Sequence, residues 1–194
     1  MVNKVWEKRQ MAHCLRLLRS GDHQAFGWFI DKYKETVFLC CRQMGLREDE
    51  IEDVASDTFL AAYKGLSRYT GQSDLSTWLW SIAYHKAVSY LRKNRKHWQL
   101  EDQVDEQIVD SRQQEPASSI QSEETEKIVW EAVKRLPRLW AITVILHYRE
   151  QKCVADIAKI MDTRENTVKT YLFRARARLK ELLAAAFGAD DDGR

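Results

Sequence analysis

The chain has 194 residues, with 31 lysines and arginines against 29 aspartates and glutamates, so the formal net charge is only +2. Seven glycines and two prolines make up about 5% of the chain, against a typical combined share of about 12%. This low share argues against sandwich, collagen-like and low-complexity architectures. Hydrophobic residues make up 44%, enough for a buried core. No apolar run approaches the ~18 residues that cross a bilayer, and the charged N-terminus lacks a secretory apolar segment.

The four cysteines have no spacing typical of a metal site or a disulfide framework. Cys40 and Cys41 are adjacent, while Cys14 and Cys153 are far from them in sequence. This pattern is typical of reduced thiols in a cytoplasmic protein. We therefore expect a cytoplasmic chain that does not insert into a membrane.

Charge is distributed in blocks along the chain. Residues 48–57 hold six acids and no base, and residues 84–98 hold five lysines and arginines and no acid. Residues 99–126 hold nine acids against one base, and residues 164–180 hold six bases against one acid. Such blocks indicate separate partners for separate surfaces.

The periodicity predicts an all-α fold of two small helical domains. The Gln- and Ser-rich, acidic stretch around Pro116 is typical of a flexible linker. We place the first domain at residues 1–97, the linker at 98–122, the second domain at 123–188 and a disordered tail at 189–194. The chain has no internal repeat.

Three helices are expected in the first domain, over about residues 23–44, 50–66 and 75–93. Ser20-Gly21-Asp22 should end a preceding helix and cap the first of these, and Gly45 should end it. In the helix from residue 75, the apolar stripe leaves Trp80 on the far side, which indicates an exposed indole.

The second domain ends in a helix-turn-helix pattern: a short helix at 154–161, a turn at 162–165 and a long basic helix. On the long helix, Val168, Leu172 and Ala175 share one side, whereas Asn166, Lys169, Thr170 and Phe173 point away. A small, polar and basic outward face suits the major groove of DNA, with arginines such as Arg174 on phosphates.

The helix from residue 75 has a second candidate nucleic-acid surface. Trp78, His85, Ser89 and Arg92 lie on one strip, and Lys93 and further bases follow. Aromatic rings among cations suit unstacked bases, because rings stack on bases while cations hold the backbone. The alternative is that the tryptophans are core and that the basic end only complements the helix dipole.

Glu50, Asp53 and Asp57 recur at helical spacing and share one predicted face. This face could dock on a basic partner, remain solvated, or hold a divalent metal in a nuclease. A single face without histidine is a poor metal cage. No nucleophile–base pair and no phosphate loop is present, so we predict no enzyme activity, no cofactor and no metal site.

These segments together resemble a bacterial extracytoplasmic-function (ECF) RNA polymerase sigma factor. The resemblance rests on EDVASDTF, YTGQSDLSTWLWSIAYHKAVSYLRKNRK, the acidic linker, VKRLPRLWAITVILHY and VADIAKIMDTRENTVKTYLFRARARLKELL, in that order. It implies a region 2 domain and a region 4 domain that bind core RNA polymerase, recognise the −10 and −35 promoter elements and melt the −10 region. Many members are held by an anti-sigma factor.

The resemblance also implies residue roles. The surface that docks on polymerase would hold Glu52, Asp53, Ser56 and Asp57, with Ser56-Asp57 where the family usually has Gln-Glu. The loop from Tyr69 to Asp74 would accept a flipped base, and His85 stands where Asn is common. The −10 set is Tyr69, Ser73, Trp78, His85, Ser89, Arg92 and Lys93, and the −35 set is Arg164, Asn166, Lys169, Thr170, Phe173 and Arg174. Such a protein works at the nucleoid.

The alternative is a ligand-responsive helix-turn-helix repressor. It predicts a stable dimer, a palindromic site and a small-molecule pocket in the first domain. The basic-aromatic helix and the acidic face would then have no role, which favours the sigma factor.

Overall fold

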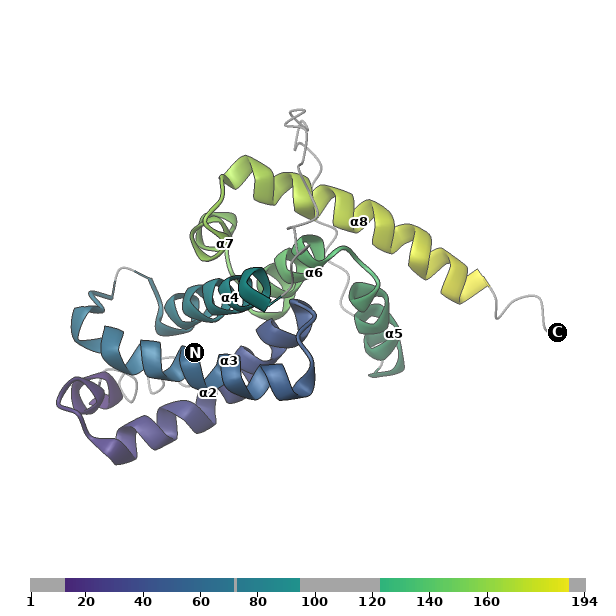
Figure 1. Cartoon of the computed structure of the whole chain (residues 1–194). Helices are drawn as coiled ribbons and strands as arrows, with labels where there is room; N and C mark the ends of the chain where they lie inside the picture. The colour runs from purple at the N-terminus through teal and green to yellow at the C-terminus, as the bar shows by residue number, and fades with distance from the viewer. Residues whose placement is uncertain (1–12, 72, 95–122, 189–194) are drawn as a thin grey trace. The chain divides into compact units, whose positions relative to one another are not determined.

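The computed structural model describes residues 13–71, 73–94 and 123–188. The chain divides into two compact units, Met1–Arg95 and Lys96–Arg194. All the regular elements in the described ranges are helical, which confirms the predicted all-α class (Figure 1). The predicted linker at 98–122 and tail at 189–194 lie outside the described residues.

The first unit contains a helix over residues 13–19, then α2 (His23–Gln43), α3 (Glu48–Gly65), the 3₁₀ turn η1 (Leu66–Arg68) and α4 (Leu75–Asn94). The chain turns between the first two helices at Gly21, whose φ of +81° favours glycine. Asp22 then caps α2, because its Oδ1 accepts a hydrogen bond of 2.8 Å from the Ala25 N–H. The predicted stop and cap are both confirmed.

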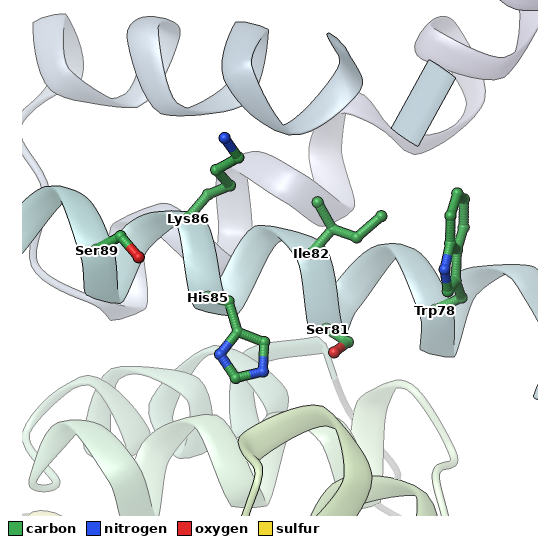
Figure 2. A pocket seen from close by; sticks show the side chains of 6 residues that line it. All are labelled: Trp78, Ser81, Ile82, His85, Lys86 and Ser89. Carbon is green, nitrogen blue, oxygen red and sulfur yellow. The ribbon is translucent and has the colours of Figure 1, made fainter. Parts of the chain in front are cut away.

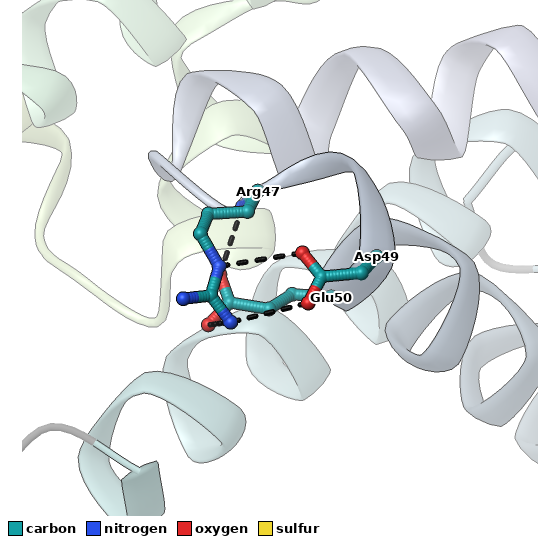
Figure 3. Close-up of polar contacts among 3 residues, drawn as sticks. All are labelled: Arg47, Asp49 and Glu50. Carbon is teal, nitrogen blue, oxygen red and sulfur yellow. Dashed lines mark hydrogen bonds and ion pairs between the residues drawn. The ribbon is translucent and has the colours of Figure 1, made fainter.

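Helix α3 begins at Glu48, two residues before the predicted start, and Arg47 explains the difference. The Arg47 N–H donates to Glu50 Oε2 over 2.8 Å, and its Nη2 lies 3.1 Å from Asp49 Oδ2 (Figure 3). Acidic residues in the first turn also interact favourably with the positive N-terminal end of the helix dipole. Glu50 is buried by this arrangement, so the prediction that it shares an exposed face with Asp53 and Asp57 is wrong.

Helices α2, α3 and α4 pack against one another in all three pairs and enclose the core of the first unit. Phe29 of α2 meets Phe59 of α3 edge-on, with ring centroids 6.1 Å apart. Trp80 of α4 is only 1% exposed, so the prediction of an exposed indole is wrong. Because α4 packs on two helices, its buried arc is wider than one stripe.

The second unit contains α5 (Glu123–Lys134), α6 (Arg138–Val144), the π-helical turn η2 (Ile145–Arg149), α7 (Val154–Met161) and α8 (Glu165–Gly188). Helix α8 packs on α5, α6 and α7. The largest fully buried side chains of this unit are aliphatic: Ile142, Ile145, Leu146, Ile157 and Ile160. Because α8 contacts each of the other three α-helices described in this unit, it is the central element of the second unit.

Tyr33 on α2 is a buried phenol in the first unit. Burial raises its pKa to about 12, and the negative charge of Asp74 acts in the same direction. The neutral phenol is thus favoured in the folded state. In the unfolded chain the same group ionises near its ordinary value of 10.

We predict that the free energy of unfolding falls as the pH rises from about 10 to 12, because the unfolded state then loses a proton that the folded state keeps. In Tyr33→Phe this fall should be smaller by about 2 kcal/mol, which is most of the value of a shift of two pKa units. Urea unfolding across this pH range measures it, with Tyr148→Phe, at an exposed tyrosine, as control. An unchanged pH dependence in Tyr33→Phe would contradict the prediction.

Candidate nucleic-acid and polymerase interfaces

The exposed side of α3 carries the four residues predicted to dock on polymerase. Glu52, Asp53, Ser56 and Asp57 are all exposed, and we call them the acidic α3 face. Asp57 Oδ2 lies 3.9 Å from Lys86 Nζ on α4. The acidic α3 face therefore adjoins the side of α4 that carries Lys86.

Two apolar residues that sequence reasoning missed continue this face along α3. Leu60 is 51% exposed and Tyr63 is 37% exposed. They follow Ser56 and Asp57 at intervals of three to seven residues, which places them on the same side of the helix. A helical projection of α3 that included apolar residues would have found them. Together they give the acidic α3 face an apolar end.

The loop between η1 and α4 is held by its own polar groups. Tyr69 is buried, and its hydroxyl donates to the Ser73 carbonyl over 2.6 Å. Asp74 Oδ1 accepts from the Thr77 N–H over 2.7 Å and from Ser76 Oγ over 2.8 Å, so Asp74 caps α4. These bonds place Tyr69 and Ser73, both predicted −10 residues, at the start of α4.

Trp78 packs beside this loop. Its ring centroid is 5.2 Å from that of Tyr69, with 44° between the ring planes. A Cβ added at Gly65 would lie 2.9 Å from Trp78 Cζ2, so the bare glycine makes room for the indole. Trp78 is thus half-buried rather than wholly core or wholly exposed.

Helix α4 carries an open pocket lined by Trp78, Ser81, Ile82, His85, Lys86 and Ser89 (Figure 2). Three predicted −10 residues, Trp78, His85 and Ser89, meet in it. Ser81, Ile82 and Lys86 were not predicted as site residues. Arg92 and Lys93 are exposed in the last turn of α4. An aromatic ring, hydroxyls and cations here form a surface that suits an unstacked nucleic-acid strand.

The turn between α7 and α8 is tight, as the helix-turn-helix pattern predicts. Helix α7 ends at Met161, and Asp162 adopts the left-handed conformation with φ +49°. The Thr163 N–H donates to the Ala158 carbonyl over 3.0 Å, which closes the end of α7. Helix α8 begins three residues after Asp162, at Glu165.

The first turns of α8 present polar, basic and aromatic side chains. Arg164, Asn166 and Lys169 are exposed, and Phe173 is 42% exposed. Arg174 is half-buried. Val168, Leu172 and Ala175 are buried as predicted. Most of the −35 set therefore lies where a major groove could reach it.

Thr170 departs from the prediction that it points away from the core. It is only 8% exposed, and its Oγ1 donates to the Asn166 carbonyl over 2.9 Å. Tyr171, which sequence reasoning did not place, is also buried. Because α8 packs on both α6 and α7, burial extends around more than one side of the helix.

Within the described ranges, no group of three or more His, Cys, Asp or Glu side chains is arranged to hold a metal ion. No helix in these same ranges is long and apolar enough to cross a membrane.

Two family models match the chain, one for each unit. Residues 29–97 match Sigma-70 region 2, which includes the acidic α3 face and the pocket on α4. Residues 126–179 match Sigma-70, region 4, which includes α7 and the first turns of α8.

Curated relatives match along most of their length. The ECF RNA polymerase sigma-E factor of Haemophilus influenzae is 30% identical over 170 residues, which cover 82% of this chain and 87% of the relative. The ECF RNA polymerase sigma factor SigW of Bacillus subtilis is 26% identical over 177 residues, covering 87% and 94%.

Two solved structures share the fold. CnrH in complex with the cytosolic domain of CnrY has a TM-score of 0.59 at 20% identity, covering 89% of this chain and 96% of that one. The sigma factor RpoE of Bartonella quintana, in complex with the anti-sigma factor NepR, has a TM-score of 0.58 at 22% identity, covering 81% and 96%. With the sequence matches to both regions and to curated relatives, these findings show that the chain belongs to the ECF RNA polymerase sigma factor family.

Proposed function

We propose that this sigma factor docks on core RNA polymerase through the acidic α3 face and reads promoter DNA with two separate surfaces. The first surface joins Tyr69 and Ser73 to the pocket on α4, and it captures and opens the −10 element. The second surface is the start of α8, which reads the −35 element. The chain supplies specificity and the polymerase supplies the chemistry, so it is not itself an enzyme.

The observation that carries this proposal is the joining of two unlike surfaces in one packed unit. The acidic α3 face and the aromatic and basic side of α4 lie on helices that pack against each other. The Asp57–Lys86 pair marks the border between them. A factor that must hold polymerase and the opened strand at the same time needs this adjacency, whereas a repressor does not.

Base capture at the −10 element has to offset lost stacking. Extruding a base costs a few kcal/mol, and favourable contacts between the base and the protein must offset this cost. Trp78 is half-buried and provides aromatic surface beside polar groups of Ser73, and aromatic stacking contributes about 1–3 kcal/mol per base. Tyr69 is buried, so its ring supports the Trp78 indole rather than stacking on a base. Arg92 and Lys93 would hold phosphates of the same strand.

At the −35 element, Asn166, Lys169 and Phe173 would face base edges, with Arg164 and Arg174 on phosphates. Thr170 can contribute at most its small exposed fraction, because its hydroxyl is bonded within the helix.

The two readers would be domains 1–97 and 123–188, joined by an acidic linker at 98–122 that DNA repels. Of the two similar solved structures, the RpoE of Bartonella quintana was solved with the anti-sigma factor NepR, and CnrH with the cytosolic domain of CnrY. We propose that this chain likewise has an anti-sigma partner and works in the cytoplasm, at the nucleoid.

Transcription in vitro with core polymerase, with and without the chain, on a library of promoters tests the proposal. We expect transcripts that start from a small, related set of promoters only when the chain is present. Transcripts that do not depend on the chain would overturn the proposal. Binding of a dimer of the chain to a palindromic DNA site in the absence of core would favour the repressor.

The double variant Glu52→Gln/Asp53→Asn should weaken core binding about two- to thirtyfold, the range for losing two exposed ion pairs. Fluorescence anisotropy of the labelled chain titrated with core polymerase measures this. Asp31→Asn/Glu35→Gln removes the same charge from exposed positions of α2 and serves as control. Equal losses in both variants would show that only overall charge matters.

Lys169→Ala should weaken holoenzyme binding to duplex −35 DNA. If Lys169 meets a phosphate, the salt slope falls by about one unit for every sequence. If it reads a base, the loss is about 1–3 kcal/mol and depends on one base pair. Lys180→Ala, farther along α8, is the control. Binding and slope that equal those of the unchanged protein would remove Lys169 from the −35 site.

A further inference from the structure

Arg19 ends the helix over residues 13–19 and reaches a part of the chain 50 residues away. Its Nη2 donates a hydrogen bond to the carbonyl oxygen of Tyr69. The guanidinium comes from an element that sequence reasoning did not connect with the −10 site. Arg19 is exposed, so water competes for this bond and its contribution is moderate.

The helix that bears Arg19 is anchored in the same core as Tyr69. Cys14 and Leu18 of this helix are buried. The Cys14 thiol and the Tyr69 phenol both raise the pKa of the buried Tyr33 phenol, so both lie within electrostatic range of it. The helix over 13–19 thus gives Arg19 a fixed base from which to hold the Tyr69 backbone.

The Tyr69 backbone controls two features of the proposed −10 site. The Tyr69 ring packs on Trp78, with 5.2 Å between the ring centroids, and Trp78 lines the pocket on α4. Its hydroxyl donates to the Ser73 carbonyl. A shift of the Tyr69 backbone would therefore move both the aromatic pair and the Ser73 backbone.

We propose that Arg19 is a positioning residue for the −10 site: by holding the Tyr69 carbonyl, it keeps Tyr69, Ser73 and Trp78 arranged for a flipped base before DNA arrives. Such preorganisation raises affinity because less conformational freedom is lost on binding. The inference rests on the proposed function, in which these residues receive the base.

The test compares Arg19→Ala and Arg19→Lys with Arg16→Ala. Arg16 is exposed on the same helix, so Arg16→Ala removes the same charge from nearly the same place. Circular dichroism melting of each full-length variant checks folding. Each holoenzyme is then titrated with a series of fluorescent single strands of the −10 element. The strands differ at one position, which carries one of the four bases or an abasic site. The readout is the ratio of affinities for the preferred base and the abasic strand.

We expect Arg19→Ala to lower this ratio about three- to tenfold, the net effect of one ordinary hydrogen bond, because water competes for the exposed guanidinium. Arg16→Ala should keep the ratio, and Arg19→Lys should restore part of it, because an ammonium can also donate to the carbonyl. An unchanged ratio in Arg19→Ala, or equal losses for the base and abasic strands, would overturn the positioning role. If the unchanged protein prefers no base over the abasic strand, the proposed base capture fails, and the role of Arg19 fails with it.

Discussion

The packing of α2, α3 and α4 on one another is the constraint on which the first unit depends. Each helix buries its apolar side in the shared core, as the contact of Phe29 with Phe59 illustrates. The remaining sides of α3 and α4 are then fixed relative to each other. The acidic α3 face, proposed to dock on polymerase, and the aromatic and basic side of α4, proposed to bind DNA, are therefore held in a fixed arrangement by ordinary core packing.

Helical periodicity predicted most of the fold because each helix is amphipathic and has clear stop signals. Gly21 and Asp22 are an example, since a left-handed turn and an N-cap have strong residue preferences. Errors arose where one helix packs on several others. Trp80 and Thr170 were placed outside a single apolar stripe, yet α4 and α8 each bury a wider arc.

The site was predictable in its chemistry more than in its geometry. Charge blocks and aromatic spacing located the acidic α3 face, the aromatic and basic side of α4, and the start of α8. They could not reveal that Glu50 turns back to the Arg47 N–H, or that Arg19 reaches Tyr69. Arg47 is not a residue type favoured before a helix, and Arg19 lies 50 residues from Tyr69, so no local residue preference indicates these contacts. Leu60 and Tyr63 were missed because only charged and polar residues were considered for the exposed side of α3.

The small net charge of +2 conceals this division of surfaces. In the proposed function, the acidic surface binds the protein partner and the basic surfaces bind nucleic acid. Where the two meet, Asp57 and Lys86 approach within 3.9 Å. The order and placement of the charges, rather than their sum, identify the partners.

The central claim is that two separate surfaces of this chain direct polymerase to two promoter elements and open one of them. Footprinting of the holoenzyme on a selected promoter, combined with permanganate probing of unpaired thymines, tests it most directly. The account predicts two separated protected elements, with reactive thymines only at the downstream one and only when core and chain are both present. A single protected element without reactive thymines, or the same pattern from the chain alone, would contradict it.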